Sequence, residues 1–172
     1  MAGCVLFIIT NRIDPRYLLP VRQVVLLVEK ARVCGLRMMG AKIGANSWVR
    51  SELFITSPQK LRIGMNTKIG IRSELWLYDD LSIGNDVEIG SGLVVHTAEH
   101  VYPDIRRPIA KQGAKYSPVR IGSDVYIGSR VTLLHGVNIC DHTIIGAGSV
   151  VTSDCESGKV YAGVPARIVG TI

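Results

Sequence analysis

Residues 121–151 read IGSDVYIGSRVTLLHGVNICDHTIIGAGSVV, and an aliphatic residue recurs in this stretch at every sixth position. These positions are Ile121, Ile127, Leu133, Ile139, Ile145 and Val151. A second small or β-branched residue stands two positions before each later one: Val125, Val131, Val137, Thr143 and Ser149. Six hexads in one unbroken frame indicate a repeat architecture, in which each repeat is one unit of a larger stack.

The hexads predict the geometry of a β-solenoid. Each hexad forms a short strand and a turn, and three hexads close one coil of about 18 residues. The aliphatic residues point inward and stack on their equivalents in the next coil, Ile121 on Ile139 and Ile127 on Ile145. The glycine that follows them is expected at the corner because it tolerates a positive φ. One coil cannot bury its apolar face alone, so neighbouring coils stabilise each other.

Earlier Ile-Gly pairs extend the repeat toward the N-terminus, at Ile43, Ile63, Ile69, Ile83 and Ile89. Two segments interrupt it. Residues 55–62 form a short disturbance, and residues 101–118, VYPDIRRPIAKQGAKYSP, form a longer excursion with three prolines. A loop that leaves a rigid scaffold is a usual place for functional residues.

The N-terminal segment differs from the repeats in its charge. Residues 1–42 hold seven basic and two acidic residues, a net charge of +5, whereas the remaining 130 residues carry +1. Asp14-Pro15 is typical of a helix start, and the stretch from Arg16 to about Met39 predicts a helix kinked near Pro20. We expect it to cap the first coil. The alternative is a basic amphipathic contact with a membrane surface.

These features divide the chain into a basic capping segment (1–42), a solenoid domain (43–169) and a short C-terminal end (170–172). The chain has 172 residues, 47% of them hydrophobic and 20% charged, which excludes a disordered protein. No apolar run approaches the ~20 residues of a membrane span. We expect no signal peptide, because no basic region precedes Val5–Thr10.

The four scattered cysteines favour reduced thiols and a cytoplasmic location. A nucleic-acid partner is not expected, because the sequence lacks a basic stripe interleaved with aromatic residues.

Three stretches carry a resemblance to a known family: HTAEHVYPDIRRPI (96–109), PVRIGSDVYIGSRVTLLHGVNI (118–139) and IIGAGSVVTSD with VYAGVPARIV (144–169). They resemble the hexapeptide-repeat, left-handed β-helix acyltransferases, in particular the galactoside, xenobiotic and capsular polysaccharide O-acetyltransferases. The resemblance implies an all-β, left-handed parallel β-helix with an N-terminal helical segment and a protruding loop at about 101–118. It also implies acetyl-CoA as acyl donor, no metal, and a homotrimer with active sites between subunits.

The resemblance implies that His100 is the general base. His100 ends the last hexad before the excursion, in Thr97-Ala98-Glu99-His100. A neutral imidazole can take a proton from an acceptor hydroxyl near pH 7. His96 is the alternative base, and either histidine could instead line a subunit interface. The oxyanion of the tetrahedral intermediate needs a donor such as the backbone N–H of Ser129.

The resemblance also implies the residues that bind acetyl-CoA. Ser129 and Ala147 would border the pantetheine arm of acetyl-CoA, with Thr152 as a further contact. Arg167 would meet its phosphates, unless it is simply a solvated charge. On the acceptor side, Asp79 and Asp80 would contact a sugar beside Trp76 and Tyr78, and solvated turn carboxylates are the alternative.

The function predicted from these residues is O-acetylation of a hydroxyl on a sugar or polysaccharide precursor. N-acetylation of an amino sugar or another small acceptor is the alternative within the family. A γ-type carbonic anhydrase needs three zinc-binding histidines, and His135 and His142 are seven positions apart, out of hexad register. A non-catalytic hexapeptide scaffold is the remaining alternative.

Overall fold

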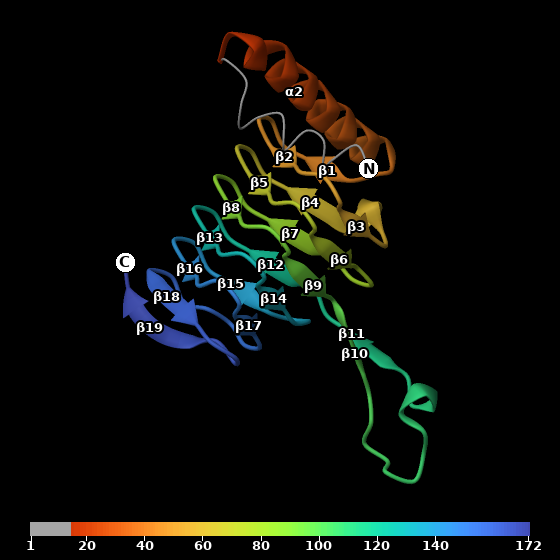
Figure 1. The fold of residues 1–172 in the computed structure, drawn as a ribbon. Coiled ribbons are helices and arrows are strands. Elements are labelled where there is room, and N and C mark those ends of the chain that lie inside the picture. Colours follow the sequence, from red (N-terminus) through yellow and green to blue (C-terminus); the bar gives the residue numbers. More distant parts are fainter. Residues whose placement is uncertain (1–14) are drawn as a thin grey trace.

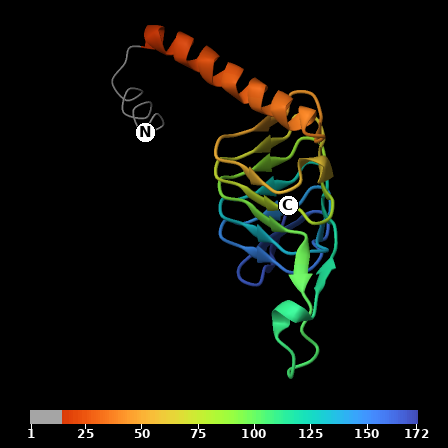
Figure 2. The ribbon, with the colours of Figure 1, turned by 90° about the vertical axis from the view of Figure 1, so that its right-hand side faces the viewer.

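Parallel coils stack on one another in this protein, with one helix across the first coil and a hairpin that projects from the side (Figure 1). The computed structural model describes the backbone of residues 15–172 and the side chains from residue 23 onward. Figure 2 shows the same stack after a quarter turn. The left-handed parallel β-helix predicted from the repeats and the resemblance is confirmed.

Each coil contributes one strand to each of three sheets. The first sheet holds β1 (Lys42–Ile43), β4 (Leu61–Ile63), β7 (Leu81–Ile83), β12 (Val119–Ile121) and β15 (Asn138–Ile139). The second holds β2 (Trp48–Val49), β5 (Lys68–Ile69), β8 (Glu88–Ile89), β13 (Tyr126–Ile127), β16 (Ile144–Ile145), β18 (Lys159–Ala162) and β19 (Arg167–Thr171), of which β19 is antiparallel to β18. The third holds β3 (Phe54–Ile55), β6 (Glu74–Trp76), β9 (Val94–His96), β14 (Thr132–Leu133) and β17 (Val150–Val151).

The inward columns predicted from the hexads are confirmed. Ile121 pairs with Ile139, and Ile127 pairs with Ile145. The second inward positions are buried as well: Val125, Val131, Val137, Thr143 and Ser149. The first coils are longer than the expected 18 residues, because Ile43 pairs with Ile63 twenty positions later. The predicted interruption at 55–62 contains a short 3-10 helix, η1 (Pro58–Lys60), at one of their corners.

The expectation that the glycine after each aliphatic residue has a positive φ is wrong. Positive φ occurs two positions later, for example at Asn66, Asp86 and Asp124. The glycines are required because successive coils approach too closely for a Cβ. A Cβ on Gly70 would lie 2.5 Å from the carbonyl carbon and oxygen of Gly90.

The corners between the sheets line up as three edges of a prism. The corners that join the first sheet to the second are called the Asn66 edge and carry Asn46, Asn66, Asp86, Asp124 and His142, all with left-handed φ. Asn and Asp tolerate this conformation better than most residues. Side chains of successive coils meet there, since Asn66 Nδ2 donates to Asp86 Oδ1 at 2.9 Å.

The helix α2 (Pro15–Met38) covers the open end of the first coil. Pro20 does not interrupt it, and it runs as one helix to Met38 (Figure 1). Val33 and Leu36 join the buried core. Two arginines satisfy carbonyl groups of the first coil: Arg32 Nη1 donates to Val49 O at 3.1 Å, and Arg37 Nη2 donates to Ile43 O at 2.7 Å.

Some of the basic residues of α2 therefore bind the helix to the first coil. Arg32 and Arg37 bind backbone carbonyls, whereas the side chains of Arg16 and Arg22 lie outside the described residues, as do Asp14 and Cys4. Within the described part of the chain, no helix is sufficiently long and apolar to span a bilayer.

The described cysteines are free thiols in different surroundings. Cys34 is exposed on α2, and Cys140 is partly buried. Cys155 is buried at the end of the first sheet, where its backbone forms an isolated parallel β-bridge with Ile139. Burial, and then the charges of Asp154 and Cys140, raise the pKa of the Cys155 thiol to about 12. The thiol of Cys155 is therefore protonated near neutral pH.

The glycine contacts give a stability prediction. We expect Gly70→Ala to destabilise the protein by about 1–3 kcal/mol, because its Cβ would overlap backbone atoms that cannot move independently. Gly35, within α2, is the control: a Cβ at this position would meet nothing within 4 Å, so Gly35→Ala should be neutral or stabilise by up to about 1 kcal/mol. Urea denaturation of both variants measures the difference. Equal stabilities would contradict this account of the glycines.

Candidate functional site

The excursion is an ordered β-hairpin. Its strands are β10 (Ala98–His100) and β11 (Ala114–Tyr116), which pair antiparallel with His100 opposite Ala114. The hairpin begins at Ala98, earlier than the expected loop start at residue 101 (Figures 1 and 2). The expectation that His100 ends the last hexad is wrong: the coil strand β9 ends at His96, and the chain then pairs with β11 instead of a neighbouring coil.

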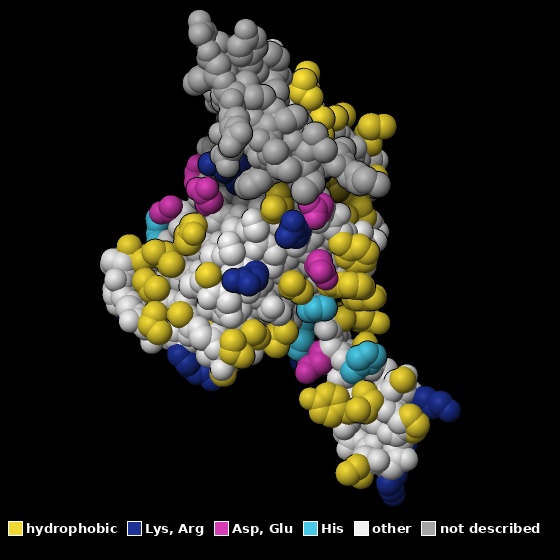
Figure 3. All heavy atoms as spheres, viewed as in Figure 1, with side chains coloured by type: hydrophobic (Ala, Val, Ile, Leu, Met, Phe, Trp, Pro, Cys, Tyr) yellow, Lys and Arg dark blue, Asp and Glu magenta, His cyan; other side chains and the backbone are white. Residues whose placement is uncertain are grey.

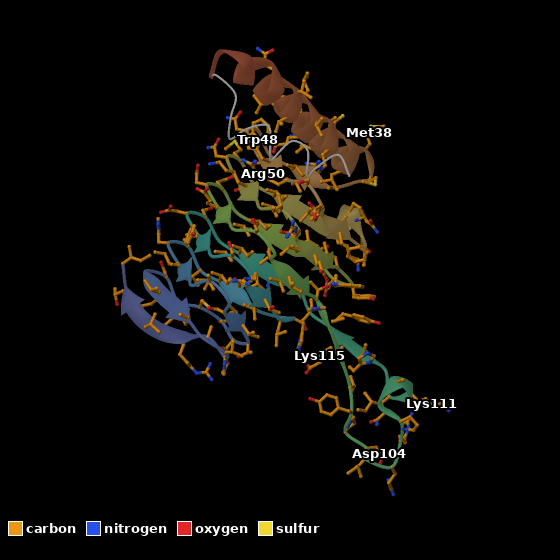
Figure 4. The ribbon with its side chains drawn as sticks, viewed as in Figure 1. Met38, Trp48, Arg50, Asp104, Lys111 and Lys115 are labelled. Carbon is orange, nitrogen blue, oxygen red and sulfur yellow. The ribbon has the colours of Figure 1, made fainter. Side chains whose placement is uncertain are left out.

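The far end of the hairpin is held by its own side chains. It contains η2 (Ile109–Lys111), and Gln112 Nε2 donates to Asp104 O at 2.8 Å. Arg106 holds the pKa of Asp104 below its usual value, through a hydrogen bond from its side chain and another from its backbone N–H. Figure 4 labels Asp104 and Lys111 near this end and Lys115 close to the coils.

The base of the hairpin is fixed by Thr97, which is fully buried. Thr97 Oγ1 accepts hydrogen bonds from the backbone N–H groups of Tyr78 (2.7 Å) and Asp79 (2.8 Å), one coil earlier. The ring of Tyr78 also stacks on Tyr116 of β11, with 6.1 Å between the ring centroids. The hairpin is therefore tied to the corner that precedes it.

A pocket of about 450 Å³ lies between this corner and the hairpin. Its lining combines aromatic rings, two imidazoles, a carboxylate and small residues: Trp76, Tyr78, His96, Ala98, Glu99, His100, Ala114 and Tyr116. Histidine side chains gather where the hairpin meets the coils (Figure 3). Apolar walls with a few polar groups are typical of sites that bind small molecules.

His100 and His96 contribute to this pocket in different ways. His100 is exposed on β10, whereas His96 is partly buried on β9. The His96 ring stacks on Trp76 with 6.1 Å between centroids, and Trp76 in turn lies 4.5 Å from Phe54. The ring of His96 is therefore part of an aromatic column along the third sheet. His100 is the more accessible imidazole of the two.

Asp79 and Asp80 lie at the corner beside the pocket, but neither lines it. Asp79 Oδ1 accepts the backbone N–H of Asp80 at 2.7 Å, and an Asp80 carboxylate oxygen lies 3.9 Å from Arg62. Both carboxylates thus take part in interactions around the corner. Their aromatic neighbours Trp76 and Tyr78 face the pocket instead.

The corners that join the third sheet to the first are called the hairpin edge: residues 56–60, residues 77–80, the hairpin with Thr97, residues 134–137 and residues 152–154. Thr152 lies here, directly after β17. His135 lies here as well, and its Nε2 is 2.7 Å from Glu99 Oε2 of the hairpin. The hairpin edge thus carries His100, Thr152 and both aspartates.

The corners that join the second sheet to the third are called the Ser129 edge: residues 50–53, 70–73, 90–93, 128–131 and 146–149. The turn at 163–166 joins β18 to β19 within the second sheet and lies against the end of this edge, since Val150 N donates to Gly163 O at 3.0 Å. Ser129 and Ala147 are exposed and stack on successive coils, since Gly148 N donates to Ser129 O at 2.9 Å. Arg167 directly follows the turn at 163–166 and is exposed. Ser129 and Ala147 present small side chains to an extended ligand, with the exposed Arg130 beside Ser129 and the Arg167 guanidinium beyond the last coil.

Within a single chain, the residues expected to bind acetyl-CoA and the expected base therefore lie on two different edges. Ser129 and Ala147 lie on the Ser129 edge and Arg167 lies at its end, whereas His100 and Thr152 lie on the hairpin edge. A ligand that contacts both sets needs the two edges brought together, which the stacking of coils within one chain does not do.

The histidines do not form the ligand set of a zinc enzyme. His135 is on the hairpin edge, and His142 is on the Asn66 edge, where its Nδ1 lies 2.7 Å from Asp124 Oδ2. Within residues 23–172, whose side chains are described, no three His, Cys, Asp or Glu side chains are grouped to hold a metal ion. His135 and His142 are separated because each hexad takes the chain on to the next edge, and residues about one coil apart, not seven, share an edge.

Sequence reasoning missed Tyr116, Ala114 and the contact between Glu99 and His135. Ala98-Glu99-His100 gives only a weak signal for a strand. Tyr116 comes sixteen residues after His100, beyond two prolines, so the sequence does not indicate that the two segments pair. The repeat gave no register for this segment.

Comparisons with known proteins agree with the fold and the repeat. The family model described as "Bacterial transferase hexapeptide (six repeats)" matches residues 118–153. The galactoside O-acetyltransferase of Escherichia coli (strain K12) is 34% identical over 146 residues, which cover 84% of this chain and 70% of that protein.

Two solved structures are also similar. A hexapeptide-repeat acetyltransferase from Vibrio cholerae has a TM-score of 0.77 at 30% identity, covering 83% of this chain and 80% of that one. A maltose O-acetyltransferase from Clostridium difficile 630 has a TM-score of 0.71 at 27% identity, covering 80% of this chain and 72% of that one. The stacked hexads, the hairpin and these likenesses together show that the chain belongs to the hexapeptide-repeat, left-handed β-helix acyltransferases.

Proposed function

We propose that this chain transfers the acetyl group of acetyl-CoA to a hydroxyl of a sugar or polysaccharide precursor, with His100 as the general base. The observation that carries the proposal is the exposed imidazole of His100 at a pocket of about 450 Å³ with aromatic walls. The names of two similar proteins, a galactoside and a maltose O-acetyltransferase, support a sugar acceptor. A Vibrio cholerae relative with a TM-score of 0.76 was solved with acetyl-CoA, which supports the donor.

The composition of the pocket suits a saccharide. A sugar ring has apolar C–H faces and a rim of hydroxyl groups. Trp76 and Tyr116 offer aromatic surface for the faces, and His96 and His100 offer hydrogen-bonding groups for the rim. His100 is then adjacent to an acceptor hydroxyl rather than buried behind it.

In the proposed reaction one proton moves from the acceptor hydroxyl to His100 and then from His100 to the CoA thiolate. Neutral His100 takes the proton of the acceptor hydroxyl while the oxygen attacks the thioester carbonyl carbon. A backbone N–H, such as that of Ser129, donates to the resulting oxyanion. The tetrahedral intermediate then breaks its C–S bond, and the CoA thiolate leaves with the proton from the imidazolium.

The separation of the two edges supports a site shared between subunits. We place the hairpin edge of one chain against the Ser129 edge of its neighbour, so that His100 and Thr152 face the neighbour's Ser129 and Ala147. Such a head-to-tail contact closes into a ring when the rotation is 120°, which gives a homotrimer. Arg167 then pairs with phosphates of acetyl-CoA beyond the pocket, where a guanidinium binds well.

The base is tested by kinetics. We expect His100→Ala to lower kcat about 10²–10⁴-fold, because proton removal is lost, with a much smaller change in KM for acetyl-CoA. The measurement is transfer of radiolabelled acetyl groups to a panel of saccharides and amino sugars. His96→Ala should retain most of the activity. The reverse ranking would assign the base to His96, and acetylation of amines alone would identify an N-acetyltransferase.

The acceptor pocket is tested through the aromatic walls. We expect Tyr116→Ala to raise KM for the saccharide about 3–10-fold, because an aromatic contact of about 0.5–1.5 kcal/mol is lost. KM for acetyl-CoA should stay constant. Tyr116→Phe keeps the ring and is the matched control. An unchanged saccharide KM in Tyr116→Ala would show that the acceptor binds elsewhere.

The shared site is tested by subunit mixing. His100→Ala damages the hairpin edge, and Ala147→Trp blocks the exposed Ser129 edge. Each variant alone should be inactive, because every site in its trimer has one damaged edge. Co-expression in equal amounts should restore about a quarter of the wild-type activity, the share of sites with two intact edges in a random mixture. No recovery in mixed trimers would place both edges' functions within one chain.

A further inference from the structure

The hairpin is held on both of its faces, and the second face carries a pair of residues outside the proposed reaction. We propose that Glu99 and His135 are a positioning pair, which anchors β10 to the following coil and so fixes the imidazole of His100 for proton transfer. This inference rests on the proposed role of His100 as the base.

The pairing of β10 with β11 determines what each face of the hairpin carries. Directly opposed residues of antiparallel strands share a face, and successive residues alternate between faces. His100 therefore shares a face with Tyr116, while Glu99 lies on the other face with Lys115 opposite. The first face meets the preceding coil through the stacking of Tyr116 on Tyr78.

The other face meets the following coil through the Glu99 pair. Glu99 Oε2 lies 2.7 Å from Nε2 of His135, at the corner after β14. The hairpin therefore contacts the preceding coil on one face and the following coil on the other, and His100 directly follows Glu99 in β10. At the level of His100, β10 pairs with Ala114 of β11, and Val101 N donates to Gly113 O at 3.1 Å.

The geometry of His135 assigns it to positioning and not to proton transfer. Its side chain is only 19% exposed, and its Nδ1 is buried with no hydrogen-bond partner among the described residues. Nε2 is occupied by Glu99, so neither ring nitrogen can reach an acceptor hydroxyl. A buried nitrogen without a hydrogen-bond partner costs free energy, so a gain in folding stability does not by itself account for the pair.

Precise placement of His100 is worth a large factor in rate. A misplacement of about 1 Å can reduce a catalysed rate about 10²-fold, because the reacting atoms lose their alignment. A strand of three residues that projects from the coil has little of its own packing to prevent such a shift.

The protein contains a matched control for this pair. His142 Nδ1 lies 2.7 Å from Asp124 Oδ2, the same distance as in the Glu99–His135 pair. Both side chains are exposed, at 65% and 70%, and they lie on the Asn66 edge, which is not the edge that carries the hairpin.

The test compares kinetics with hairpin dynamics in the full chain. We expect Glu99→Ala and His135→Ala each to lower kcat about 10–100-fold, with KM for acetyl-CoA changed less than about twofold. The double variant should be no worse than either single one, because both remove the same contact. His135→Gln keeps a donor near the position of Nε2 and should recover most of kcat. His142→Ala should leave kcat unchanged.

Hydrogen exchange separates this inference from the proposed function. Amides of residues 98–116 should exchange faster in Glu99→Ala and His135→Ala than in His142→Ala. Faster exchange with wild-type kcat would overturn the positioning role and leave the base unaffected. Equal loss of kcat in His135→Gln and His135→Ala would also overturn it. Wild-type activity of His100→Ala would refute the base itself.

Discussion

The structure depends on the close approach of successive coils. A Cβ on the glycine of the repeat would lie 2.5 Å from backbone atoms of the next coil at Gly70, and 2.6 Å at Gly84. This approach allows each strand to pair with its equivalents above and below, and it places the aliphatic residues in continuous columns. The period of the sequence is thereby converted into straight edges, on which residues one coil apart become neighbours.

Straight edges explain why one chain does not bring its candidate residues together. Ser129 and Ala147 are 18 positions apart and therefore stack, whereas Thr152 is only five positions beyond Ala147 and falls on a different edge. No rearrangement of a rigid coil brings these edges into contact. An enzyme built from this fold can join them by placing a second copy alongside, and small side chains on one edge with a projecting hairpin on the other suit such a contact.

The fold could be predicted from the sequence because the hexads are a short-range signal. Their spacing predicts that Ile121 stacks on Ile139, and the two residues do pair. The hexads do not give the physical reason for the glycines, because a single coil does not show how near the next one comes. The hairpin has no such signal, since Ala98 and Tyr116 pair across a segment with no repeat. The contact of Glu99 with His135 joins residues 36 positions apart and depends on that hairpin.

A hairpin position for the proposed base overcomes a limit that the coil imposes. A side chain on the flat face of a sheet cannot reach far from the stack of coils. In contrast, β10 carries His100 beyond the corner and away from the stack. That reach sacrifices the rigidity supplied by stacked coils, so the hairpin needs other anchors. Thr97 holds its base by two backbone hydrogen bonds, and Tyr116 stacks on the preceding coil. The contact between His135 Nε2 and the Glu99 carboxylate completes this arrangement on the opposite face, next to His100.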